Sequence, residues 1–292
     1  MNGTCFSIPP LLAGVMLRIA VPAAHGQAAR PPDDSQLKAY LMEEFIAIDG
    51  YDSDNTRQLK AGGVTDEQLR RVLVEIYAEA GAALKRAEDE YGRMASALRR
   101  ENAVRELGSC TCENTKTFLL EVAADKTEDG FLRTIAVGSL LRAADAEEAR
   151  DVLLRFLVGP DRIASDMDRS GVYPVANTAW NESSPEKKQA ICEALQAGLA
   201  HESTHWVFRS GDGWLCEMSP TYAKSKERLA MFERMHATPV PDGELFDRQS
   251  LVPQIEMLRK LKKHTSVNTN LATVIARDFN QPLPEEERIA LE

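Results

Sequence analysis

Residues 100–107, RENAVREL, and residues 133–140, RTIAVGSL, carry the same pattern at a spacing of 33 residues. The shared residues lie at positions one, four, five and eight, a spacing that places them on one face of a helix. Repetition with a period between 20 and 50 residues is typical of stacked helical pairs. The pattern therefore predicts an all-α fold built from antiparallel helical pairs. Its members are Arg100, Ala103, Val104 and Leu107 in the first copy and Arg133, Ala136, Val137 and Leu140 in the second.

A second apolar helix pattern follows each copy. Alanine and valine let two helices approach closely, and leucine fills the space between layers. Together with the Arg-Ala-Val-Leu pattern, this stretch resembles the HEAT-repeat family, including its irregular bacterial relatives, over about residues 98–235. The resemblance implies an irregular α-solenoid, and such arrays usually bind other molecules without carrying out chemistry. The residues of the following helices are Phe118, Leu119, Val122 and Ala123, then Ala149, Val152, Leu153 and Phe156.

Composition shifts divide the chain into three parts. We expect a helical-repeat array at 30–235, interrupted by a Gly- and Pro-containing loop insertion at 159–185. Loops of this length are usually functional or disordered, so Tyr173 and Trp180 in the insertion are candidate contact residues for a partner. Residues 236–292 read as a linker, two helices at roughly 248–263 and 269–279, and an acidic tail.

The first 29 residues are apolar and rich in small side chains, and the first acidic residue is Asp33. This composition predicts a secretory signal peptide with a cut near Gln27, and hence a periplasmic or secreted protein. The leader lacks an N-terminal Lys or Arg, and Arg18 interrupts its apolar core, so a disordered leader stays open as the alternative. No later segment is apolar enough to span a bilayer.

Four cysteines follow the leader. In an oxidising compartment an even number permits two disulfides, but the pairing is not readable from the sequence. Each cysteine is equally compatible with a small buried apolar side chain. These residues are Cys110, Cys112, Cys192 and Cys216.

The charge balance bears on the class of partner. Thirty-five basic residues against 45 acidic ones give a formal net charge of −10. Nucleic-acid binding requires clustered Lys and Arg, so the acidic excess argues against it. A protein or peptide partner is the expectation that remains.

The sequence HESTH at 201–205 is the one stretch that suggests an enzyme. In zinc peptidases His201 and His205 would hold the metal from one face of a helix, and Glu202 would activate a water molecule. However, the preceding apolar pattern ends near Ala200, and Ser and Thr at 203–204 are typical of the start of a new helix. We therefore favour a turn between two helices and keep a zinc-dependent metallopeptidase as the alternative.

A calcium site is a weaker alternative. Asp166, Asp168, Ser170 and Gly171 match the first half of a calcium-binding loop, in which alternating oxygens surround the ion. Asn177 stands where the closing glutamate is required. A polar turn explains the same residues, because Asp and Gly are what turns need. The sequence thus predicts a non-catalytic binding or scaffolding protein without an assigned cofactor.

Overall fold

The computed structural model describes residues 31–46, 54–240 and 245–264, and every regular element within these ranges is a helix. This confirms the predicted all-α class. The predicted leader at 1–29 and the predicted helix at 269–279 lie outside the described residues. The helices are α1 Asp34–Glu44, α2 Asp54–Ala61, α3 Asp66–Arg86, α4 Glu90–Leu107, α5 Glu113–Ala124, α6 Gly130–Ala143, α7 Ala146–Leu157, α8 Asp166–Asn181, α9 Pro185–His201, α10 His205–Met218, α11 Pro220–Ala223, α12 Lys226–Ala237, the 3-10 helix η1 Arg248–Leu251 and α13 Val252–His264.

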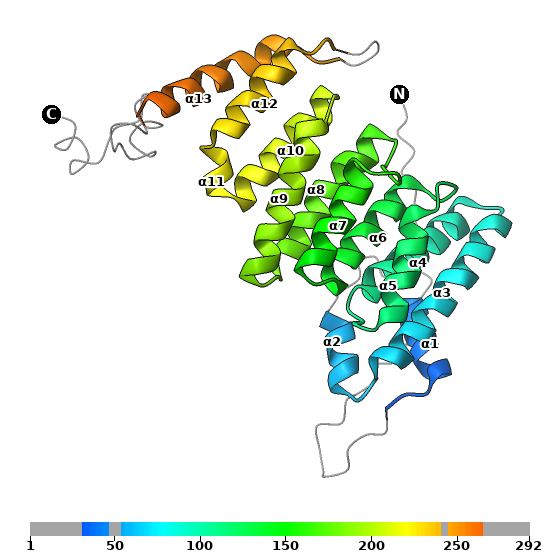
Figure 1. Ribbon diagram of the computed structural model, residues 1–292. Coiled ribbons are helices and arrows are strands. Elements are labelled where there is room, and N and C mark those ends of the chain that lie inside the picture. Colours follow the sequence, from blue (N-terminus) through cyan, green and yellow to red (C-terminus); the bar gives the residue numbers. More distant parts are fainter. Residues whose placement is uncertain (1–30, 47–53, 241–244, 265–292) are drawn as a thin grey trace, which may run out of the picture.

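Helices α4, α6, α8 and α10 pack successively against one another, and α5, α7 and α9 lie on one side of them (Figure 1). Hydrogen bonds link neighbouring helices of this row both near their C-terminal ends and near their N-terminal ends. At the C-terminal ends, the Ser139 hydroxyl of α6 donates to the Arg105 carbonyl of α4 at 3.2 Å. At the N-terminal ends, the Thr134 hydroxyl donates to the Asp168 carbonyl of α8 at 3.1 Å. The row helices are therefore parallel, and their equivalent ends share an edge of the molecule.

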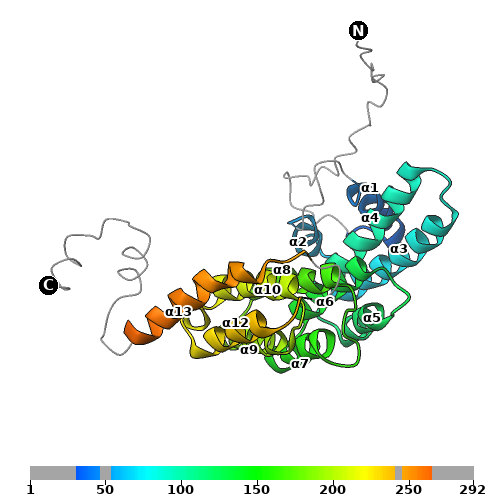
Figure 2. The same cartoon turned by 90° about the horizontal axis from the view of Figure 1, so that it is seen from above.

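Seen from above, α1, α3 and α4 lie at one end of the molecule, and α12 and α13 lie at the other (Figure 2). The first end is closed by α3, which packs along α4, and by α1, which covers α3. The other end is closed by η1 and α13, which pack on α12. Within the described ranges, we find no helix that is both long and apolar enough to cross a membrane.

The apolar residues of the repeated pattern are buried on α4 and α6, two helices that pack against each other. Ala103, Val104, Ala136 and Val137 are completely buried. Arg133, the arginine of the second copy, is buried as well, and its Nε donates to the Ala123 carbonyl at 2.8 Å. In the first copy, Arg100 forms an ion pair with Glu128 in the turn before α6. Each copy of the pattern thus supplies apolar side chains that pack in the core and an arginine that binds a residue of a neighbouring segment.

The predicted loop insertion at 159–185 is wrong for most of its length. Residues 166–181 form α8, whose N-cap Ser165 accepts a hydrogen bond from the Asp168 amide. Gly171 and Pro174 favour a loop when the sequence is considered locally, but a proline removes only one backbone hydrogen bond of a helix. Burial of the apolar face compensates for it. The sequence RSGVYPVA at 169–176 repeats the pattern of α4 and α6 a third time, with Val172, Tyr173 and Ala176 at the apolar positions.

The apolar stretch at 69–98 forms parts of two helices. Helix α3 continues through Gly81 to Arg86, and α4 begins at Glu90. The Asp89 side chain accepts from the Gly92 amide and caps α4. A side-chain cap therefore decides the boundary, and the glycines do not.

Among the described residues, the four cysteines Cys110, Cys112, Cys192 and Cys216 are free. Cys110 is completely buried, and its burial raises the pKa of the thiol to about 12. It behaves as a small apolar side chain, as one of the two interpretations of the sequence expected.

Two glycines of α10 give a matched test of how closely α10 packs on α8 and α9. A Cβ added at Gly211 would lie 2.6 Å from the buried ring of Tyr173, whereas a Cβ at Gly213 would meet nothing within 4 Å. Gly211→Ala is therefore expected to lower the free energy of unfolding by about 1–3 kcal/mol through overpacking. Gly213→Ala should raise it by about 0.5–1 kcal/mol. Urea denaturation of both variants measures the difference, and equal values would contradict the close approach at Gly211.

Candidate functional site

The HESTH residues lie on two helices and the turn between them. His201 is the last residue of α9, Glu202 caps that helix, and His205 is the first residue of α10. This confirms the predicted helix boundary. The two histidines therefore do not stand one turn apart on a single helix, which is the arrangement that zinc peptidases use.

Glu202 is held in a buried ion pair. Its carboxylate accepts from Arg169 Nε at 2.8 Å, and both side chains are less than 5% exposed. The same carboxylate accepts from the backbone amides of Ser203 and Thr204, each at 2.9 Å. Burial raises the pKa of Glu202, but the hydrogen bonds from Arg169 and these amides outweigh it, and the pKa is lowered. A carboxylate stabilised in this way is a poor proton acceptor.

His205 is also part of the core. Its Nε2 lies 2.9 Å from the Met235 carbonyl oxygen of α12, and its ring lies 4.9 Å from the Phe246 ring. His201, in contrast, is exposed. Throughout the part of the chain that the structure describes, no group of three His, Cys, Asp or Glu side chains is placed to hold a metal ion.

The residues of the calcium hypothesis are helical. Asp166 and Asp168 lie in the first turn of α8, where Asp166 forms an ion pair with Arg169 at 2.5 Å. The Ser170 hydroxyl donates to the Met167 carbonyl at 2.7 Å. A calcium loop needs oxygens that alternate along an irregular backbone, and residues 166–171 do not have one.

The two aromatic residues proposed as partner contacts behave differently. Tyr173 is completely buried between α8 and its neighbours, so it does not form a contact surface and that expectation is wrong. Trp180 is half-buried near the end of α8, with Lys188 Nζ 4.5 Å from its ring centroid. The sequence placed both residues in a loop, whereas the helix turns only one of them toward the surface.

An apolar edge, defined by Phe131, Met167 and Trp206, runs along the N-terminal ends of three row helices. Each is the second residue of its helix (α6, α8 and α10), and their exposed fractions are 52%, 74% and 47%. The Thr204 hydroxyl lies 3.4 Å from Asp166 Oδ1, which brings the starts of α8 and α10 together. Phe131 and Met167 each lie two residues before the repeated arginine, so the third copy of the pattern was the signal that would have located this edge.

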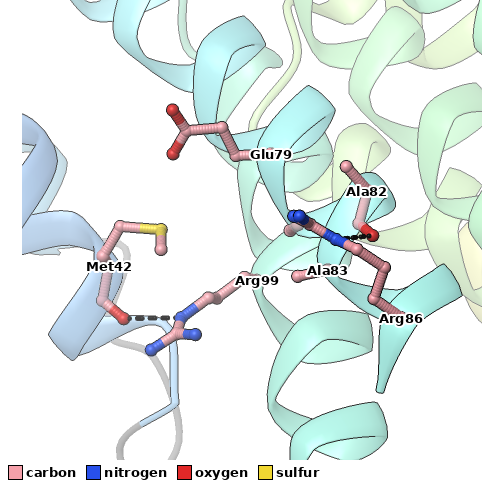
Figure 3. Close-up of a pocket in the computed structure, with 7 residues that line it drawn as sticks. Met42, Glu79, Ala82, Ala83, Arg86 and Arg99 are labelled. Atoms are coloured by element: carbon pink, nitrogen blue, oxygen red, sulfur yellow. Dashed lines mark hydrogen bonds between the residues drawn. The ribbon is translucent and has the colours of Figure 1, made fainter.

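One cavity of about 360 Å³ lies between α1, α3 and α4. Its polar side chains are already engaged, as Figure 3 shows for two of them: Arg99 Nε donates to the Met42 carbonyl at 3.0 Å, and Arg86 Nε donates to the Ala82 carbonyl at 3.1 Å. Glu79 accepts from Lys38 at 2.5 Å. The rest of the lining is alanine, so this hollow offers little for a ligand to recognise.

A second cavity, of about 350 Å³, lies at the opposite edge from the apolar one, where α4, α6 and α8 end and α2 and α9 adjoin them. We call it the basic cavity. Its lining holds five cationic and two acidic side chains in a chain whose net charge is −10. The sequence alone does not reveal this cavity, because its cations come from four separate helices. They are Arg57 and Lys60 of α2, Arg105 of α4, Arg142 of α6 and Lys187 of α9.

Comparisons with protein-family models, with curated proteins and with solved structures find no match. The apolar edge and the basic cavity are therefore the two features of the molecule from which we infer a function.

Proposed function

We propose that this chain is a non-catalytic helical-repeat protein, an irregular α-solenoid of the HEAT-like type, that binds a protein or peptide partner after export. The row of parallel helices supports the solenoid assignment, because α4, α6 and α8 carry an arginine at the same position of the pattern, namely Arg100, Arg133 and Arg169. The predicted leader supports export. Two of the three residues that a zinc peptidase would need at 201–205, Glu202 and His205, are engaged in structural contacts instead.

The apolar edge is the observation that supports a protein partner. Large apolar side chains that stay exposed at equivalent positions on neighbouring helices are typical of an interaction site, whereas scattered ones are not informative. Exposed Asp129 and Asp166 flank Phe131 and Met167. A partner that presents apolar side chains next to Lys or Arg fits this edge in both hydrophobicity and charge.

Replacing all three residues of the apolar edge tests the proposal. We expect the triple variant Phe131→Ser, Met167→Ser and Trp206→Ser to fold normally and to retain about tenfold less partner, since buried aromatic anchors dominate interface energies. The measurement is quantitative affinity capture of one identified partner from a periplasmic extract, using wild type and variant side by side.

Tyr91→Ser is the matched control, because Tyr91 is 68% exposed and lies in the first turn of α4, more than two turns before Arg100. It should leave capture unchanged. Equal capture by wild type and the triple variant would exclude the apolar edge, and a folded wild-type chain that retains no specific partner would contradict the proposed function itself.

A further inference from the structure

We propose that the basic cavity is a second binding site, independent of the apolar edge, for a compact ligand that carries two or more oxyanion groups. The first support is an imbalance of charge. Lys60 is neutralised by Asp66 at 2.7 Å, but Arg105, Arg142 and Lys187 form no ion pair with any described residue. Three cations without an ion pair around one hollow favour a ligand with more than one negative charge.

Desolvation strengthens this attraction. Burial lowers the pKa of Arg142, although Glu106 and Glu182 partly oppose the shift. Burial likewise lowers the pKa of Lys187, against the effect of Asp145, Glu148 and Glu182. A cation that has lost water without gaining a carboxylate stabilises an incoming anion more than an exposed cation does.

The cationic groups are also held in place before a ligand arrives. Lys187 Nζ donates to the Ala144 carbonyl at 2.6 Å and to the Arg142 carbonyl at 3.2 Å, at the end of α6. The Arg142 guanidinium donates to the Arg105 carbonyl at the end of α4. Gly108 makes room for it, because a Cβ there would lie 2.9 Å from Arg142 Nε. Side chains fixed in this way lose little further entropy on binding.

The two acidic side chains of the lining do not cancel the cations. Glu106 is buried, and its carboxylate accepts a hydrogen bond from the Thr56 hydroxyl at 2.5 Å, so this carboxylate already has a donor. Glu182 caps α8, and the three cations Arg105, Arg142 and Lys187 still outnumber the two carboxylates. The remaining lining is mostly hydroxyl and backbone groups, which suit a polar ligand. A volume of about 350 Å³ admits a small molecule of the size of a tricarboxylate.

Isothermal titration calorimetry of the full chain with citrate and, separately, with inorganic phosphate tests this inference at constant ionic strength set by NaCl. We expect saturable binding of citrate that Lys187→Gln weakens by about tenfold or more, since one charge-assisted hydrogen bond is lost. Tighter binding of citrate than of phosphate supports a ligand with two or more oxyanion groups. Tighter binding of phosphate, which is a single oxyanion group, would overturn that part of the inference.

Arg150→Glu is the matched control, because Arg150 is exposed on α7 and does not line the cavity. It should leave the affinity within about twofold of wild type. If Lys187→Gln does not fold, Arg57→Glu on the exposed side of α2 replaces it, with the same expected loss. No saturable heat with either anion, or affinities that neither cavity variant changes, would overturn the inference.

Discussion

Arg169→Ala is expected to lower the free energy of unfolding by about 3–5 kcal/mol, the cost of leaving one partner of a buried ion pair uncompensated. Arg169 joins the start of α8 to the turn between α9 and α10, through Glu202 at 2.8 Å and the Ile163 carbonyl at 3.0 Å. Removing the guanidinium leaves the buried Glu202 carboxylate with only the more exposed Arg162, at 3.5 Å, as a cation. Chemical denaturation followed by circular dichroism measures the loss.

Two further variants separate this effect from a general loss of packing. Arg169→Met combined with Glu202→Leu removes both charges and should recover most of the stability, because well-packed apolar side chains replace buried pairs at little cost. Arg71→Ala breaks the exposed pair of Arg71 with Asp34 and should cost less than about 1 kcal/mol. Equal losses in Arg169→Ala and Arg71→Ala would contradict a structural role for the buried pair.

The same pair predicts a pH dependence. The folded-state pKa of Glu202 lies below its ordinary value of 4.5, so the unfolded chain takes up a proton first on acidification. The stability contributed by this carboxylate is therefore complete above about pH 4.5 and is lost as the pH falls through the folded-state pKa. The double apolar variant should lose less stability than wild type between neutral pH and pH 3. Parallel pH profiles of the two proteins would contradict this assignment.

The helical class and the HESTH turn were predictable from the sequence because each depends on neighbouring residues. The 33-residue spacing placed Arg100 and Arg133 on equivalent helices, and Ser203 with Thr204 marked the start of α10. Helix α8 was missed because Gly171 and Pro174 outweigh its apolar spacing when the chain is read locally. Its burial against α6 and α10 compensates for both residues, and that compensation exists only in the folded chain.

Neither edge of the row was predictable in this way. The basic cavity brings Arg57 close to Lys187 through the packing of α2 against the ends of the row, a proximity that no sequence spacing encodes. The apolar edge depends on Phe131, Met167 and Trp206 occupying equivalent positions, and recognising it requires α8 to be a helix. Because the sequence predicted a loop at 159–185, it did not reveal the apolar edge, which is the feature that supports a protein partner.

Asp212→Ala is the second substitution expected to cost about 3–5 kcal/mol of unfolding free energy, for the same physical reason, where α10 meets α11 and α12. Both carboxylate oxygens of Asp212 in α10 accept from Arg228 of α12, each at 2.8 Å, and the Tyr222 hydroxyl of α11 donates to Oδ1 at 3.0 Å. This one carboxylate thus joins three helices. Its removal leaves a buried guanidinium and a buried hydroxyl without their acceptor.

The size of this loss depends on the uncompensated Arg228, and that dependence can be measured directly. Arg228→Met in the Asp212→Leu background should be clearly more stable than Asp212→Ala, because no buried charge remains. Arg259→Ala, which breaks an exposed pair with Glu233 on the outer side of α12, should cost less than about 1 kcal/mol. If Asp212→Ala is no less stable than Arg259→Ala, the carboxylate does not hold α10, α11 and α12 together. Packing of Phe208 against Phe232, whose ring centroids lie 5.0 Å apart, would then be the main link between α10 and α12.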